Sequence, residues 1–117
     1  NLVVSVGKTF IASRMAGTSS AVMSHMGLGA GTTSPVSGDT ALESALGANV
    51  ALSSTTPSSN TVTYVATFDA GVSTGAVTEA GIFNASSSGT MLCRTSFTPF
   101  TKTTGQTVIV TWTITIA

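Results

Sequence analysis

The sequence predicts a mainly β protein: an antiparallel β-sandwich or jelly-roll-like barrel with one or two short helices. The first observation is the stretch 106–116, where apolar residues recur at every second position: Val108, Val110, Trp112, Ile114 and Ile116. Threonine fills most positions between them, and it is both β-branched and polar. A period of two indicates a strand with one buried face. Thr61 to Phe68 repeats the pattern, so both strands are expected to share one core.

The amino-terminal residues predict a strand followed by a helix. Leu2 to Val6 is a short apolar run, typical of a first strand or of an arm that adds to a neighbouring sheet, so residues 1–7 form an arm or edge strand. Lys8 to Met15 has helical spacing and ends before Gly17. Its inward residues are expected to be Phe10, Ile11 and Met15.

The next elements are a strand, a loop and a second helix. Ala21 to Leu28 is compatible with a strand, and residues 29–39 are rich in glycine, serine and proline, which predicts a long loop. Residues 40–43, Thr-Ala-Leu-Glu, have the capping-box spacing. This spacing predicts a helix of one or two turns from Ala41 to Leu46, closed by Gly47.

The remaining residues predict two hairpins and the last strand. Strands are expected at 49–55 and 61–68 around a turn at 56–60, then at 77–84 and 90–97 around a turn at 86–89. Pro99 lies in the connection 98–105, which precedes the final strand. The length of that strand favours a central place in its sheet. Trp112 is expected to contribute most to burial.

Length and charge limit the classes of function. The 117 residues suit a single domain, 1–117, and a second core is not expected. Only 7% of residues are charged, against about a quarter in ordinary soluble domains, and four basic residues balance four acidic ones. Such a chain creates no field of one sign, so neither nucleic acid nor a membrane surface is an expected partner. The weak repulsion between copies favours an assembled state.

Groups that carry chemistry are scarce, and we predict no enzyme, no cofactor and no metal site. His25 is the single histidine, and zinc would need further His or Cys ligands. A Ser-His-Asp triad lacks the Gly-x-Ser-x-Gly elbow. His25 is therefore interpreted as a partly buried strand residue bonded to backbone, with a pH-sensing interface role as the alternative. The methionines are interpreted as core or interface fillers.

Four further features have structural interpretations. Cys93, the one cysteine, is expected to be buried and unreactive. Glu79 and Asp69 could form a carboxylate pair for glycoside chemistry, but we expect them at strand ends, with Glu79 paired to Arg94 across the second hairpin for at most about 1 kcal/mol if exposed. The glycines of 27–31 predict a loop with free backbone, since the Gly-Lys-Ser/Thr end of a phosphate-binding loop is missing. The Asn-Ala-Ser sequon at 84–86 indicates a surface turn.

Several segments in their order resemble a group of small virion proteins of tailed bacteriophages, over nearly the whole chain. They are His25 to Thr33, Gly38 to Leu42, Thr63 to Phe68, Thr78 to Asn84 and Val110 to Ile114. Glu-Ala-Gly-Ile-Phe at 79–83 is similar to a segment of tail collar and tail fibre head modules. The resemblance implies a β-rich, often multimeric structural subunit without catalytic residues. Fibre shaft repeats are missing, which favours a capsid decoration (cement) protein.

The first functional hypothesis is a cement subunit on the outer capsid surface of a virion, made in the host cytoplasm. It would bind the major capsid protein and copies of itself, as a trimer in preference to a dimer. The alternatives are a tail collar or fibre adaptor or tip, and a carbohydrate-binding or hydrolytic β-sandwich. Strand-edge addition is expected to use the amino-terminal arm, whose deletion would leave the domain folded but weaken particle binding. The expected contact residues are Leu2, Val3, Val4 and Val6.

Overall fold

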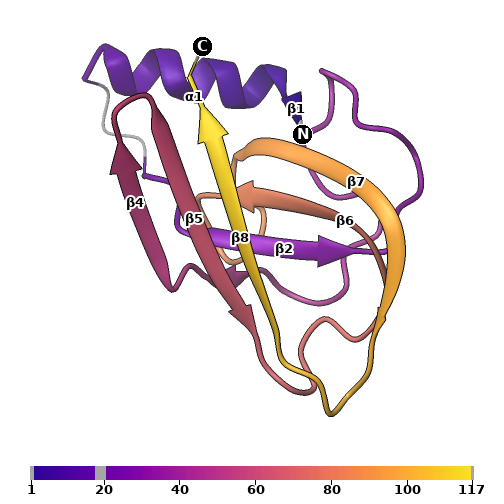
Figure 1. Cartoon of the computed structure of the whole chain (residues 1–117). Coiled ribbons are helices and arrows are strands. Elements are labelled where there is room, and N and C mark those ends of the chain that lie inside the picture. The colour runs from indigo at the N-terminus through magenta and orange to yellow at the C-terminus, as the bar shows by residue number, and fades with distance from the viewer. Residues whose placement is uncertain (1, 18–20, 117) are drawn as a thin grey trace.

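The computed structural model of the chain describes residues 2–17 and 21–116, and it confirms the mainly β fold with two antiparallel sheets (Figure 1). A five-stranded sheet has the order β1-β7-β6-β2-β3, and a three-stranded sheet has the order β4-β5-β8. The larger sheet comprises β1 (Leu2–Val3), β2 (His25–Gly29), β3 (Val50–Ala51), β6 (Gly75–Phe83) and β7 (Met91–Lys102). The smaller sheet comprises β4 (Ser54–Ser58), β5 (Thr61–Phe68) and β8 (Val108–Thr115).

The two strands with the clearest alternation pair with each other along their whole length. Thr61 of β5 lies opposite Thr115 of β8, and Phe68 opposite Val108. The apolar residues at the alternating positions point inward as predicted, except Ile116, which lies beyond β8 and is exposed. The core between the sheets includes Phe68, Trp112, Met26, Ile82 and Leu92. The central position expected of the last strand is wrong: β5 is central and β8 forms an edge.

Strand boundaries shift where local chemistry competes with the sheet. The strand expected over 49–55 is split between β3 in the larger sheet and β4 in the smaller one. The strand expected over 21–28 begins only at His25. β7 continues through Pro99, because its register with β6 is irregular between Val77 and Glu79. An irregularity of this kind lets a strand include a residue without an N–H.

The helix α1 (Ser5–Met15) begins three residues earlier than predicted and packs against β7 of the larger sheet. Phe10 and Ile11 pack against the core, as expected. Met15 does not, since 84% of its surface is exposed. The helix ends as predicted at Gly17, which has a φ of 80° and donates its N–H to the carbonyl of Arg14.

The amino-terminal segment is part of the domain's own sheet and is not a free arm. Leu2 and Val3 form the edge strand β1, which pairs with β7 opposite Arg94 and Cys93. Val4 is fully buried and donates its N–H to the carbonyl of Leu92. A fully buried side chain cannot contact another molecule. The expectation that residues 2–6 can be deleted without harm to the fold is therefore abandoned, because deletion would expose the core beneath Val4.

The helix α1 packs tightly against the larger sheet at Gly7. A Cβ added to this residue would lie 2.1 Å from the carbonyl oxygen of Leu92 on β7. We expect Gly7→Ala to destabilise the fold by about 1–3 kcal/mol, because the helix would have to move away from the sheet. In an unconstrained helix the same change would stabilise by roughly 1 kcal/mol. Urea unfolding followed by circular dichroism measures the sign, with exposed Lys8→Ala as the control. A gain in stability would contradict the close packing.

Candidate functional site

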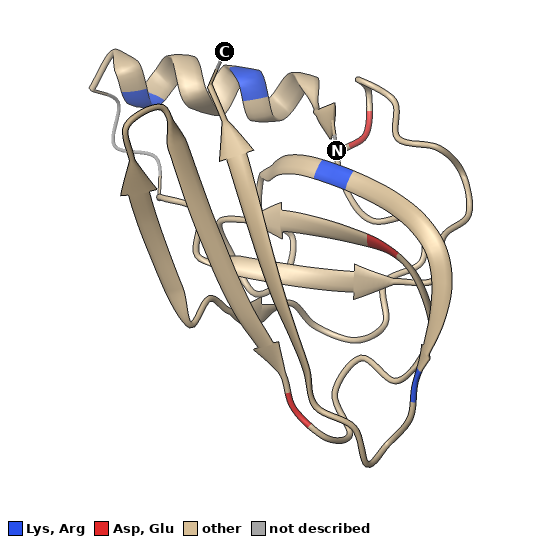
Figure 2. Ribbon diagram, viewed as in Figure 1, with Lys and Arg blue, Asp and Glu red and all other residues tan. Residues whose placement is uncertain are grey.

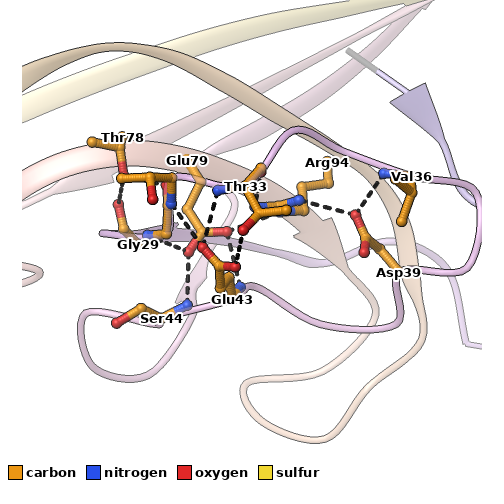
Figure 3. A network of polar contacts seen from close by, with 11 residues as sticks. Gly29, Thr33, Val36, Asp39, Glu43, Ser44, Thr78, Glu79 and Arg94 are labelled. Carbon is orange, nitrogen blue, oxygen red and sulfur yellow. Dashed lines mark hydrogen bonds and ion pairs between the residues drawn. The ribbon is translucent and has the colours of Figure 1, made fainter.

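The described part of the chain contains one concentrated group of charged side chains, and a buried ion pair lies at its centre (Figure 3). Glu79 comes from β6, Arg94 from the neighbouring β7, and Asp39 and Glu43 from the connection between β2 and β3. Glu79 and Arg94 have side-chain exposures of 0% and 2%. A buried charge is tolerated only when it is paired and hydrogen-bonded, so the partners of these two groups define the site.

The carboxylate of Glu79 accepts four hydrogen bonds. Its Oε1 accepts the N–H of Glu43 at 2.9 Å and Nε of Arg94 at 2.9 Å. Its Oε2 accepts the N–H of Gly31 at 2.8 Å and that of Ser44 at 2.8 Å. Three of the four donors are backbone groups of the β2–β3 connection. One side chain thus attaches that connection to the sheet at two separate points.

Arg94 completes the cluster from the other side. Its Nε lies 2.9 Å from Glu79, while Nη1 lies 3.0 Å from Oδ2 of Asp39 and Nη2 donates to the carbonyl of Thr33 at 2.8 Å. The same Asp39 oxygen accepts the N–H of Val36 at 3.0 Å. The Glu79–Arg94 pairing is confirmed, but Glu79 lies in the middle of β6 and not at a strand end as expected. Because the pair is buried, the limit of about 1 kcal/mol for an exposed pair does not apply to it.

Glu43 closes the loop at the surface, in place of the predicted capping box. Its Oε1 accepts the N–H groups of Thr32 at 2.7 Å and Thr33 at 3.1 Å, and its Oε2 accepts the hydroxyl of Thr33. The residues predicted as a helix from Ala41 to Leu46 are not helical. The physical reason is that the Glu43 and Ser44 N–H groups are held by Glu79 in a non-helical course.

The glycines of residues 27–31 allow this close arrangement. Gly27 and Gly29 belong to β2, so only the end of the run is a loop. A Cβ on Gly31 would lie 2.5 Å from Oε2 of Glu79 and 2.5 Å from Cβ of Glu43. The expectation of free backbone is therefore wrong at Gly31, whose N–H is bound to Glu79. Glycine here makes room for two carboxylates.

The hydrogen bonds set the charge state of the cluster. Burial alone would raise the pKa of Glu79, but the N–H groups of Ser44 and Glu43 together with Arg94 lower it below the ordinary value. The hydroxyl and N–H of Thr33 lower the pKa of Glu43. Burial would lower the pKa of Arg94, yet its bonds to the acids raise it. All three groups therefore stay charged at neutral pH.

These shifts predict acid lability. A glutamate has a pKa of about 4.3 when unfolded, and the folded values of Glu79 and Glu43 lie lower. Their contribution is present above the unfolded pKa and is lost as the pH falls through the folded pKa. We expect the urea midpoint to be steady from roughly pH 6 to 8 and to fall on acidification below about pH 4.5. Unfolding measured across this range checks it, and a midpoint that rises below pH ~4.5 would contradict the assignment.

The cluster is poorly suited to acid–base catalysis. General acids and bases need a pKa near the operating pH and access to substrate, whereas Glu79 has a lowered pKa and is fully buried. Its two oxygens already accept four hydrogen bonds from protein groups. Asp69 directly follows the end of β5, as expected, and is not part of the cluster, so the carboxylate pair with Glu79 that we considered less favourable is not formed. The arrangement serves to fix the β2–β3 connection.

Other residues singled out in the sequence occupy separate places. Cys93 is buried, as predicted, and burial raises the pKa of its thiol to about 12. His25 is partly buried on β2, as expected, but its ring Nδ1 lies 2.7 Å from the Ser24 hydroxyl, which is a side-chain partner. Asn84 of the sequon accepts the N–H of Thr90 at 2.7 Å in the β6–β7 turn.

A second feature is an apolar groove of about 470 Å³ between β7 and β8. Its floor is formed by residues such as Leu28 and Ala80 of the larger sheet, and Trp112 of β8 contributes to its wall. Phe97 and Phe100 form its far side, stacked with ring centroids 6.0 Å apart and 38% and 39% exposed. Ile109, at 66% exposure, lies at the β8 rim. No pattern in the sequence had predicted this groove.

Charge is distributed unequally between the two sheets (Figure 2). The three strands of the smaller sheet contain no charged residue, whereas Glu79, Arg94 and Lys102 lie in the larger sheet and are buried. Lys102 donates Nζ to the carbonyl of Asp69 at 2.9 Å. The groove therefore opens beside an uncharged sheet.

Residues 2–17 and 21–116 contain no group of three or more His, Cys, Asp or Glu side chains that could hold a metal ion. Within the same residues, no helix has the length and hydropathy required to traverse a bilayer. Comparison with known protein families, curated proteins and solved structures finds no match to this chain. The geometry and the resemblance described above are thus the basis for a functional proposal.

Proposed function

We propose that the chain is a structural protein of a tailed-phage virion, a decoration (cement) subunit that binds the outer shell and stabilises contacts between major-capsid subunits. The observation that supports this proposal is that the protein has an exposed apolar surface suited to docking, while its charged side chains are concentrated in a cluster that stabilises the fold. The exposed apolar residues Phe97, Phe100 and Ile109 gather around one groove beside an uncharged sheet. Buried Glu79 and Arg94 serve the fold itself.

Such a surface suits many identical contacts on a shell. Removal of apolar area from water supplies roughly 25 cal/mol per Å², so a modest contact repeated over hundreds of copies adds up to a large stabilisation. A nearly uncharged surface places no like charges against each other when copies crowd together. The major capsid protein is the proposed partner. Self-association as a trimer remains part of the proposal, with a dimer as the alternative.

A carbohydrate-binding role has one observation in its favour, namely the two exposed phenylalanines that line the groove. Sugar recognition also requires polar groups that converge on the hydroxyls. Among the residues that line this groove, side-chain hydroxyl groups come only from Thr95 and Thr111. The stacked phenylalanines also cover part of each other. The apolar lining favours a protein partner, and a tail collar or fibre role is separated from the shell role by copy number.

The experiment is a quantitative protein gel of purified particles that carry this chain, with the major capsid band as the internal standard. We expect hundreds of copies per particle. A dozen copies or fewer would contradict the shell role and favour the tail alternative, and a chain absent from particles would contradict both. Removal of the subunit is expected to lower the temperature at which filled heads release DNA.

A further inference from the structure

We propose that the free edge of β8 binds an extended, uncharged segment of a partner chain as an added strand, whose apolar side chains enter the β7–β8 groove. This inference deepens the proposed function, and it rests on that function for the origin of the partner. It also moves strand-edge addition from the amino-terminal segment, where the sequence suggested it, to the edge of the smaller sheet.

The pairing pattern shows which backbone groups of β8 are free. The N–H of Ile116 donates to the carbonyl of Asn60, and Thr115 lies opposite Thr61. Antiparallel pairs alternate between bonded and non-bonded positions, so the even-numbered residues of β8 bond to β5. The N–H and carbonyl groups of Ile109, Thr111 and Thr113 then point away from β5. No backbone hydrogen bond to these groups is found among the residues that the structure describes.

The strands at the other sheet edges are short or contain proline, whereas β8 is long and contains none. β1 and β3, at the two edges of the larger sheet, have two residues each. β4, at the opposite edge of the smaller sheet, contains Pro57. Proline, charged side chains and short length are the usual means by which proteins block edges. β8 has eight residues, without proline or charge. A long edge without these features is suited to receive a strand.

The position of the groove beside β8 and its lack of charged side chains indicate which kind of segment would bind there. A strand added to β8 would lie beside the groove, with alternate side chains over Phe97, Phe100 and Trp112. Polar side chains in the groove are threonines, so a charged occupant would have no counter-charge. β7 bounds the far side of the groove, so an added strand would lie between β7 and β8. An extended apolar segment is therefore the favoured occupant.

The probe is a blocked, labelled peptide with the sequence of β5, residues 61–68, because this sequence pairs with β8 inside the protein. Fluorescence anisotropy with the full chain measures its affinity. We expect saturable binding, weakened about tenfold or more by Thr111→Pro, since proline removes an outward N–H and projects its ring into the edge. Ile109→Lys should weaken it similarly by placing a charge at the rim. Thr55→Pro, on the already blocked β4 edge, is the matched control and should bind normally.

The peptide also has a matched control, N-methylated at the positions of Thr63 and Val65, where its N–H groups would face β8. Strand addition would be overturned by any of three results. The methylated and unmethylated peptides could bind equally well, Thr111→Pro and Ile109→Lys could bind the peptide as well as the wild-type chain does, or the wild-type chain could fail to bind it. A wild-type dimer that Thr111→Pro separates in sedimentation would also overturn it, because a second copy would then cover the edge. If the peptide does not bind but the protein still binds particles, strand addition is wrong and the decoration role stands. If the peptide binds but the protein does not bind particles, the decoration role is wrong and the binding site at the β8 edge stands.

Discussion

Replacement of Glu79 by glutamine is expected to lower the free energy of unfolding by about 3–5 kcal/mol, although the two side chains have the same shape. Each carboxylate oxygen accepts two hydrogen bonds: Oε1 from Glu43 and Arg94, and Oε2 from Gly31 and Ser44. A glutamine has only one acceptor oxygen. Whichever way its amide turns, its NH₂ group faces two donors, and Arg94 loses its buried counter-charge.

Urea unfolding at pH 7, followed by the fluorescence of Trp112, measures this loss. Asp69→Asn is the control, because Asp69 is an exposed acid, and a change within about 0.5 kcal/mol is expected there. In Glu79→Gln the acid lability below about pH 4.5 should also become weaker, since one of the two shifted carboxylates is gone. A loss below roughly 1 kcal/mol would contradict the four-bond geometry of Glu79.

Trp112→Ala is expected to cost about 3–5 kcal/mol, because it leaves a large cavity between the sheets. The indole is 7% exposed, lies opposite Tyr64 of β5, and belongs to the main core cluster. It also forms part of the groove, so the same change should enlarge the proposed docking surface.

Circular dichroism during urea unfolding measures the effect, since the variant lacks the single tryptophan of the chain. Ile109→Thr serves as the control on the same strand, because Ile109 faces outward and threonine keeps the β-branch. Its stability should stay within about 0.5 kcal/mol of the parent. If Trp112→Ala loses less than about 1 kcal/mol, the inward placement of this face is wrong.

The regular strands could be predicted because their side chains repeat an inside–outside pattern. The period of two in 61–68 and 106–116 identifies both strands and their buried faces, and two-residue spacing gives Trp112 the core position that it occupies. The order of strands within a sheet could not be predicted in this way. A strand's own residues do not specify its neighbours, and so the edge position of β8 could not be deduced from its length.

The charged cluster was predictable only as a pair. The hairpin register brings Glu79 and Arg94 together, and the sequence suggested this pairing. The burial of the pair depends on residues 31–44 folding over it, which no local pattern specifies. The capping-box spacing at 40–43 even favoured a helix, and the long-range bonds from Glu79 to the Glu43 and Ser44 N–H groups outweigh that local preference.

The groove could not be inferred because it joins residues from distant segments. Phe97 and Phe100 are close in the chain, but Ile109 and Trp112 reach the groove from β8, and Leu28 reaches it from β2. One feature of the sequence does point to the groove. Ile109 lies on the face of the last strand that is otherwise threonine, so an apolar side chain is exposed there. An exposed apolar residue on a polar face can indicate a binding surface.

The central proposal is that this β-sandwich is a repeated subunit of a phage shell, and direct imaging tests it best. Gold-labelled antibody against the chain, or cryo-electron microscopy of particles with and without it, would locate the copies on intact virions. The account predicts density distributed over the outer capsid surface, at positions that recur between neighbouring major-capsid subunits. Label confined to the tail or collar, or no label on the particle, would contradict it.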